Sequence, residues 1–317
     1  MSRNLLSSSL LALGLACPAM AEVPRVSADI APVHSLVARV MAGVGEPSLI
    51  VSPGASPHEY NLRPSQAAAL QNADLVFWVS PDLTPWLEGA ISSLAADAAV
   101  TELLEAEGTI ELEVREGALF ESHDHDEDRE AEDGHADDLE EDHSHEGHAH
   151  DPHAWLSTDN ASVWLNTIAT ELSAADPDNA STYKANAAEA QEELSTLRTE
   201  INEVLEPKRG GKFISFHDAY QYFEHAFEFP ASGAISLSDA SAPSPGRIAE
   251  IRARVAEQGI GCVLSEPQFD PGIVNAVMEG SAARTAVVDP LGAEIEPGPE
   301  LYPQVLRNLA AKLADCM

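Results

Sequence analysis

The sequence predicts an α/β fold in which two (β/α)4-type lobes with parallel sheets are joined by one long backbone helix. Short apolar segments alternate with amphipathic segments in both halves of the chain, which is the pattern of βαβ units and parallel sheets. An uninterrupted amphipathic stretch at 176–207 separates the two halves. The predicted organisation is therefore a leader at 1–21, an N-terminal lobe at 22–175, the linking helix at 176–207 and a C-terminal lobe at 208–317.

The individual elements follow from short runs of apolar and β-branched residues and from helical periodicity. Strands are predicted at 25–30, 47–51, 74–79 and 100–103 in the first half, and at 213–216, 231–237, 260–264 and 285–288 in the second. Helices are predicted at 33–43, 64–72, 85–94 and 157–174, then at 218–227, 245–259, 271–280 and 301–316. The segment 52–63, rich in proline, glycine and serine, is predicted to be a loop.

The linking helix is predicted from an apolar stripe along one face. The stripe recurs at steps of four and three and consists of Tyr183, Ala187, Ala190, Leu194, Leu197, Ile201 and Val204. Pro177 fits the first turn, where its missing N–H has no intrahelical partner, and Pro207 ends the stretch. A coiled-coil helix would show the same stripe, but the repeat does not continue elsewhere and alanine occupies two seam positions. The helix is therefore predicted to be a strut between the lobes.

The first 21 residues have the composition of a secretory signal peptide. Arg3 supplies the positive charge, 5–16 the apolar core and 19–21 a small-residue cleavage site. The apolar run is too short to cross a bilayer. Cleavage after Ala21 predicts a mature chain in the periplasm, and acylation of Cys17, as in a lipoprotein, is the alternative.

Two of the three cysteines, Cys262 and Cys316, remain after such a cleavage. An even pair in an oxidising compartment predicts a disulfide. It would join the strand that begins at Ile260 to the C-terminal helix. Two buried free thiols are the alternative.

The 53 acidic residues far outnumber the 17 lysines and arginines and give a net charge of −36. This charge excludes nucleic acid as an expected partner, because phosphate binding requires lysine and arginine. The segment 121–150 has almost no apolar content, so it is predicted to be disordered. Its mixture of histidine and carboxylate predicts a low-affinity metal loop, and a solvated acidic linker is the alternative. The histidines of this loop are His123, His125, His135, His143, His145, His148 and His150.

Three other histidines lie where α/β lobes bind ligands, beyond the C-terminal ends of strands. His58 is in the loop after the second strand, His217 directly follows the strand 213–216, and His153 starts a helix. Imidazole binds Zn²⁺ well, and such a site takes about four ligands. A lone histidine is more often structural, so the spacing of these three is a weak signal. The remaining histidines, His34 and His225, are predicted to be structural or packing residues.

Five sequence runs make the assignment more specific. They are Gly54-Ala55-Ser56-Pro57-His58-Glu59-Tyr60 with Arg63-Pro64-Ser65, Asp151-Pro152-His153-Ala154-Trp155, Phe216-His217-Asp218-Ala219-Tyr220, Glu266-Pro267-Gln268-Phe269 and Asp289-Pro290-Leu291-Gly292. With these runs the chain resembles the zinc-uptake branch of the metal-binding ABC-transporter substrate-binding proteins, the ZnuA type. The resemblance covers essentially the whole mature chain, and the His-rich insertion before Asp151 is itself a mark of the zinc branch.

The resemblance implies a metal in the cleft between two lobes. His58 and His153 would come from the N-terminal lobe and His217 from the C-terminal lobe. A third imidazole, where manganese-type relatives tend to carry a carboxylate, favours Zn²⁺ over Mn²⁺. The fourth ligand is left open between Asp289, water and Glu59.

The function that the resemblance implies is high-affinity Zn²⁺ capture in the periplasm and delivery to an ABC-transporter permease for import. The expected partners are a zinc ion, the membrane permease and a periplasmic zinc chaperone, and the chain is expected to be a monomer. With a rigid strut, only small lobe motions are expected.

Other functions remain open at this point. A manganese-type or broader metal-binding protein of the same family is the nearest alternative. An adhesin or a general metal buffer is another. A secreted zinc hydrolase with Glu59 or Glu266 as general base is disfavoured, because neither an HExxH nor a GxSxG motif is present, so the chain is not expected to be an enzyme.

Overall fold

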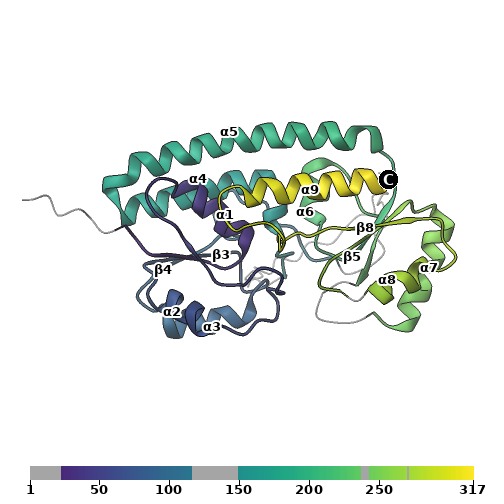
Figure 1. Ribbon diagram of the computed structural model, residues 1–317, viewed down its shortest axis with the longest axis horizontal. Helices are drawn as coiled ribbons and strands as arrows, with labels where there is room; N and C mark the ends of the chain where they lie inside the picture. The colour runs from purple at the N-terminus through teal and green to yellow at the C-terminus, as the bar shows by residue number, and fades with distance from the viewer. Residues whose placement is uncertain (1–22, 116–148, 237–242, 270) are drawn as a thin grey trace, which may run out of the picture.

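The computed structural model of the chain describes residues 23–115, 149–236, 243–269 and 271–317. It confirms the predicted α/β fold: two lobes, each built on a four-stranded parallel sheet, lie side by side, and one long helix runs across both (Figure 1). The predicted leader with Cys17 lies outside the described residues, as does most of the acidic loop. The predicted domain boundaries stay predictions.

The N-terminal sheet has the strand order β2-β1-β3-β4. Its strands are β1 (Val26–Ala28), β2 (Ser48–Leu49), β3 (Leu75–Trp78) and β4 (Ala99–Glu102). The helices of this half are α1 (Ala31–Val40), α2 (Pro64–Gln71), α3 (Pro85–Leu94) and α4 (Thr158–Ala175), with the 3-10 turn η1 (Ala154–Leu156) before α4. Helices α2 and α3 cover one face of the sheet, and α1 and α4 lie between the other face and α5 (Figure 1).

The C-terminal sheet repeats this order as β6-β5-β7-β8. Its strands are β5 (Phe213–His217), β6 (Ala234–Ser236), β7 (Cys262–Ser265) and β8 (Arg284–Val287). Its helices are α6 (Gln221–Phe227), α7 (Pro245–Gln258), α8 (Pro271–Met278) and α9 (Leu301–Cys316). Helix α6 begins three residues later than predicted, because Ala219 N–H donates to His217 O (3.0 Å) and this tight turn interrupts the helical pattern.

The long helix α5 (Ala180–Leu205) is flanked by the 3-10 turns η2 (Pro177–Asn179) and η3 (Glu206–Lys208). Its apolar stripe is buried as predicted from Tyr183 to Ile201. The prediction that Val204 is the last residue of the stripe is wrong, because Val204 is 42% exposed and Leu205 is buried instead. At 3.6 residues per turn, Leu205 lies about 40° from the direction of Tyr183 and Val204 about 60° on the opposite side, so Leu205 is nearer the centre of the stripe.

One apolar core runs through both lobes. It contains Trp155 and Trp164 from the first half, Leu197 from α5, and Phe213 and Leu306 from the second half. Helix α9 contributes to this continuity because it packs on α1 as well as on α5. The lobes are therefore not separate hydrophobic units.

The predicted disulfide is present. Cys262 in β7 is bonded to Cys316 in α9, with 5.5 Å between their Cα atoms. It attaches the last helix to the C-terminal sheet. Within the described part of the chain, every helix is too short or too polar to span a bilayer.

The strand order of the two sheets indicates where a ligand site is expected. In each sheet the chain adds its second strand on one side of the first strand and its third strand on the other. Such a reversal opens a crevice beyond the C-terminal ends of the strands. His217 is the last residue of β5, the strand at this reversal, rather than the residue after the strand as predicted.

Candidate metal centre

His58 is carried by the loop between β2 and α2, which polar side chains hold in place. Trp86 of α3 donates its indole N–H to Pro57 O, the carbonyl just before His58 (2.7 Å). Tyr60 donates its hydroxyl to Gln66 Oε1 (3.0 Å), and Gln66 Nε2 donates to Ser52 Oγ (2.9 Å). These bonds connect both ends of the loop to secondary structure, so the loop has a defined conformation without regular elements of its own.

His153 lies just before η1 and is buried. Asp151 Oδ1 accepts from the backbone N–H of His153 (3.0 Å) and faces its ring Nδ1 at 2.7 Å. A carboxylate at Nδ1 keeps the proton on that nitrogen and leaves the lone pair of Nε2 for a metal. Asp151 is two residues away in the chain, in a run that the sequence analysis singled out.

His217 has the same arrangement, with a partner distant in sequence. Its Nδ1 lies 2.5 Å from Glu266 Oε1, and Glu266 is buried. Gln268 Nε2 donates to the other oxygen of Glu266 (2.9 Å). Glu266 lies in one of the runs that carry the family resemblance, but its place beside His217 could not be predicted, because no local spacing connects two residues 49 positions apart.

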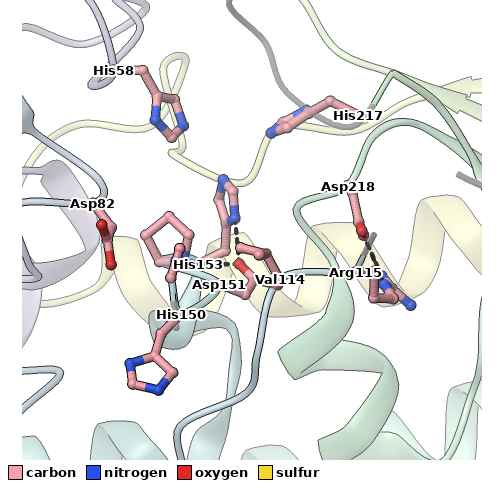
Figure 2. A pocket seen from close by; sticks show the side chains of 11 residues that line it. His58, Asp82, Val114, Arg115, His150, Asp151, His153, His217 and Asp218 are labelled. Atoms are coloured by element: carbon pink, nitrogen blue, oxygen red, sulfur yellow. Dashed lines mark hydrogen bonds and ion pairs between the residues drawn. The ribbon is translucent and has the colours of Figure 1, made fainter. Parts of the chain in front are cut away.

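The structure brings His58, His153 and His217 together. One ligand nitrogen from each lies within 4.8 Å of the others, and Figure 2 shows the three rings converging from different elements. In a tetrahedral zinc site with Zn–N bonds of about 2.0–2.1 Å, neighbouring nitrogens are roughly 3.3 Å apart. The trio is therefore within a small side-chain adjustment of the geometry that zinc requires.

A cavity of about 230 Å³ lies beside the trio. All three histidines line it, together with Asp82 and His150 from the N-terminal half and Asp218 from the C-terminal half (Figure 2). A hydrated cation is small compared with this volume, so the cavity gives an ion access to the imidazoles.

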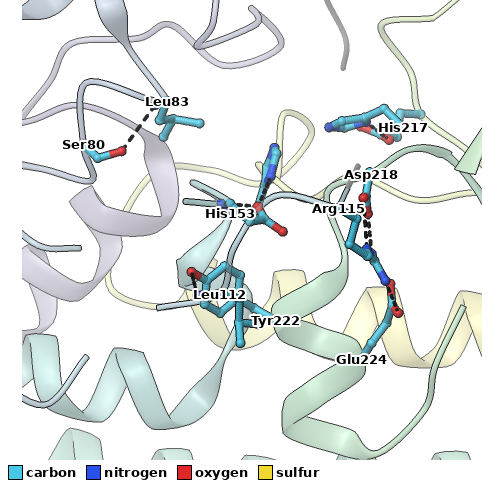
Figure 3. A network of polar contacts seen from close by, with 11 residues as sticks. Ser80, Leu83, Leu112, Arg115, His153, His217, Asp218, Tyr222 and Glu224 are labelled. Atoms are coloured by element: carbon cyan, nitrogen blue, oxygen red, sulfur yellow. Dashed lines mark hydrogen bonds and ion pairs between the residues drawn. The ribbon is translucent and has the colours of Figure 1, made fainter. Parts of the chain in front are cut away.

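Two charged residues that the sequence did not predict as part of the site, Arg115 and Asp218, also line this cavity. Arg115 pairs with Asp218 and Glu224 (Figure 3). Burial raises the pKa of Asp218, and the neighbouring Arg115 guanidinium opposes this rise. No local pattern marks these residues, because the two carboxylates are more than 100 positions from Arg115.

The two side chains considered as fourth ligand, Asp289 and Glu59, have different environments. The carboxylate of Asp289 accepts three backbone N–H groups, from Leu291 (2.9 Å), Gly292 (2.9 Å) and Ala293 (2.6 Å). Glu59 is exposed. Among the described residues, the only group of three or more potential ligands within this reach is the histidine trio.

The remaining histidines fall into separate settings. His150 is half-buried, and its Nδ1 lies 3.4 Å from Glu111 Oε2. The other six histidines of the predicted metal loop lie outside the described residues. His34 is structural as predicted, since its Nε2 is 3.0 Å from Pro47 O and burial lowers its pKa. The packing role predicted for His225 is wrong, because α6 turns this side chain to solvent.

The lobes and the convergent imidazoles define a two-lobed metal-binding protein of the solute-binding class. The chain belongs to the ZnuA family: the model of that family, described as zinc-uptake complex component A periplasmic, matches residues 26–316. This family comprises periplasmic solute-binding proteins and not enzymes, as the sequence predicted.

Individual members of this family are similar to the chain over most of their length. The chain is 45% identical over 312 residues to the high-affinity zinc uptake system protein ZnuA of Paracoccus denitrificans, covering 96% of each chain. It is 43% identical over 304 residues to the protein of the same name from Brucella abortus, covering 92% of this chain and 91% of that protein. A solved structure described as the crystal structure of ZnuA superposes with a TM-score of 0.73 at 25% identity, covering 93% of this chain and 99% of the other.

Proposed function

We propose that the protein captures Zn²⁺ in the periplasm and delivers it to the permease of an ABC transporter for import. His58, His153 and His217 are the proposed ligands. The observation that carries this proposal is the convergence of their nitrogens within 4.8 Å, with buried carboxylates behind two of the three rings. Three neutral imidazoles are a borderline donor set that suits Zn²⁺ better than the harder Mn²⁺.

Water is the proposed fourth ligand. The carboxylate of Asp289 already accepts three backbone N–H groups, and among the described residues its oxygens do not belong to the group of ligand atoms that lie within 4.8 Å of one another. The proposed role of Asp289 is instead to hold the turn after β8 through these hydrogen bonds. Asp289→Asn is therefore expected to weaken zinc binding far less than loss of any histidine of the trio.

The location and the loop complete the proposal. The predicted leader at 1–21 directs the chain to the periplasm, and the loop at 121–150 binds further zinc ions weakly and passes them to the cavity. His150 at the cavity supports this route. We also propose that the protein acts as a monomer and exchanges zinc with a periplasmic chaperone as well as with the permease.

Zinc titration of the mature chain tests the proposal. The His58→Ala/His153→Ala/His217→Ala variant is expected to lose the tight site, while His225→Ala, which removes an exposed histidine away from the trio, keeps it. Competition between Zn²⁺ and Mn²⁺ separates the zinc function from a manganese function. If the triple variant bound zinc as tightly as the unmodified chain, the trio would not be the transport site.

Deletion of 121–148 tests the loop separately and keeps His150. We expect the tight site to remain and the weak additional sites to disappear. An unchanged number of bound ions after the deletion would contradict the role proposed for the loop.

A further inference from the structure

Arg115 connects the two sides of the metal site through partly buried ion pairs. Its Nε donates to Asp218 Oδ2 (3.0 Å), and its Nη1 and Nη2 each donate to an oxygen of Glu224 (2.9 Å). Nη2 also pairs with Asp218 Oδ1. Asp218 directly follows His217, and Glu224 lies on α6 (Figure 3). A guanidinium held by two carboxylates has both its position and its orientation fixed.

The backbone beside Arg115 is bonded to the segment that carries His153. Glu113 and His150 form an antiparallel bridge. On either side of it, Val114 N–H donates to Ala149 O (3.1 Å) and Asp151 N–H donates to Leu112 O (2.8 Å). The segments 112–115 and 149–153 thus form a short ribbon, and the ribbon ends at a proposed zinc ligand.

This ribbon is attached to the N-terminal half by Asn160 of α4. Its side-chain oxygen accepts from Ile110 N–H (2.8 Å), and its amide nitrogen donates to Ile110 O (3.0 Å). The position of the ribbon is therefore fixed relative to helix α4 by these hydrogen bonds, in addition to the chain connection between His153 and α4.

The C-terminal half holds the same ribbon from the other side. Tyr222 of α6 accepts from Leu112 N–H (3.0 Å). The amide of Gln221, oriented to donate as its neighbours require, reaches Asp151 Oδ2 (3.1 Å) and Glu113 O (3.2 Å). Among these contacts between the ribbon and the C-terminal half, only those of Arg115 are ion pairs. Its pair with Asp218 connects the ribbon to the turn that follows His217.

We propose that Arg115 is a positioning residue for zinc, which fastens the ribbon bearing His153 to the turn after His217 and so sets the spacing between these two ligands. Asp151 and Glu266 orient each ring within its own half. Arg115 fixes the two halves relative to each other, where the ring centroids of His153 and His217 are 5.3 Å apart. The proposal rests on the zinc function proposed above. A site whose ligands are already spaced for the ion releases it slowly.

The test is Arg115→Lys, which keeps one positive charge but cannot form the four hydrogen bonds, two to each carboxylate, that the guanidinium makes. Arg39→Lys is the matched control: the side chain of Arg39 is also 19% exposed and also pairs with two carboxylates, Glu189 and Glu193, away from the trio. Zinc affinity is measured by competition with a chelator, and release by rapid mixing with excess chelator. We expect Arg115→Lys to weaken zinc binding about 10- to 100-fold, mainly through faster release, and Arg39→Lys to change it less than about twofold.

Cobalt absorption provides a readout that a general loss of stability would not change. The intensity of Co²⁺ d–d bands reports how close the ligand set is to tetrahedral, so Arg115→Lys is expected to weaken or shift these bands. If Arg115→Lys does not fold, the Arg115→Met/Asp218→Asn/Glu224→Gln variant removes all three charges together and is measured in the same way.

The outcomes separate the two proposals. If the unmodified chain binds zinc tightly and the Arg115 variants match Arg39→Lys in affinity, release and cobalt spectrum, the positioning role is wrong and the zinc function stands. If His153→Ala and His217→Ala bind zinc as tightly as the unmodified chain, the zinc function itself is wrong.

Discussion

Two of the proposed ligands, His153 and His217, each have a buried carboxylate next to the ring Nδ1. Asp151 faces His153 at 2.7 Å, and Glu266 faces His217 at 2.5 Å. The carboxylate fixes the tautomer and the ring direction and raises the basicity of the nitrogen that faces the metal. The strength of metal binding is therefore expected to depend on residues that do not touch the ion.

Glu266→Gln tests this dependence at His217. A glutamine of the same shape can still accept from Nδ1–H, but it lacks the charge, so we expect zinc affinity to fall about 10- to 100-fold. Glu250→Gln, which alters an ion pair with Arg247 on α7, is the control. Calorimetric titration in a competing chelator measures the difference, and equal affinities in both variants would contradict the role assigned to Glu266.

Asp29 is a second residue whose environment has a measurable effect. Its buried carboxylate accepts from Ile30 N–H (2.7 Å) and Val79 N–H (2.8 Å). Burial raises its pKa to about 7, against the opposing effect of these bonds. A carboxyl group with a raised pKa in the folded state stabilises the fold below its unfolded pKa, and this stabilisation is lost as pH rises through the folded value.

We therefore expect the free energy of unfolding of the unmodified chain to fall, relative to that of Asp29→Asn, as pH rises from about 4 to about 8. The change is on the order of 3–4 kcal/mol. Asn removes the titration and one acceptor, and the lost acceptor adds a pH-independent cost of about 1–3 kcal/mol. Urea unfolding at several pH values measures both, and parallel curves for the two proteins would show that Asp29 does not titrate in this range.

At the scale of elements, α5 holds the molecule together through one face. The buried positions of that face belong to the core that both lobes share. Helix α4 packs along it, and α9 and α1 contact it as well. The burial of a given position on α5 therefore determines how much it contributes to the stability of the whole chain.

The end of α5 gives a direct comparison of two adjacent apolar residues. Leu205→Ala removes a buried side chain and is expected to lower the free energy of unfolding by about 2–4 kcal/mol. Val204→Ala alters a side chain that is 42% exposed and is expected to cost less than about 0.5 kcal/mol. Urea unfolding of both variants measures the difference. Equal losses would mean that Val204 belongs to the stripe after all.

At the scale of the whole molecule, the shared core restricts how the lobes can move. Core residues from both halves contact each other through α5, and α9 packs on α1 of the first half. Wide hinge closure would break this core. Release of a captured ion is therefore expected to depend on loops at the cavity, such as the one that carries His58.

Small-angle scattering with and without zinc measures this restriction. We expect the radius of gyration to change by less than about 1 Å, because a preorganised binding surface moves little. The variant that lacks 121–148 is measured in parallel, so that ordering of the loop is not mistaken for closure of the lobes. A larger compaction in both proteins would indicate hinge closure.

The sequence by itself determined the order of the strands and helices and placed each histidine of the trio near the end of one of these elements, although the start of α6 and the end of β5 differ from the prediction. These features are local: periodicity fixes which face of an element is buried, and the C-terminal ends of parallel strands are where ligands bind. Asp151 was also within reach of the sequence, since it lies two residues from His153.

Only the tertiary structure decided which distant groups complete the site. Glu266 reaches His217 from the end of the neighbouring strand β7, Arg115 reaches Asp218 from the other half of the chain, and Leu205 rather than Val204 enters the core. The physical reason is that burial and charge pairing depend on how elements pack against each other. Residues far apart in the chain become neighbours only through that packing, and no periodicity within one segment records it.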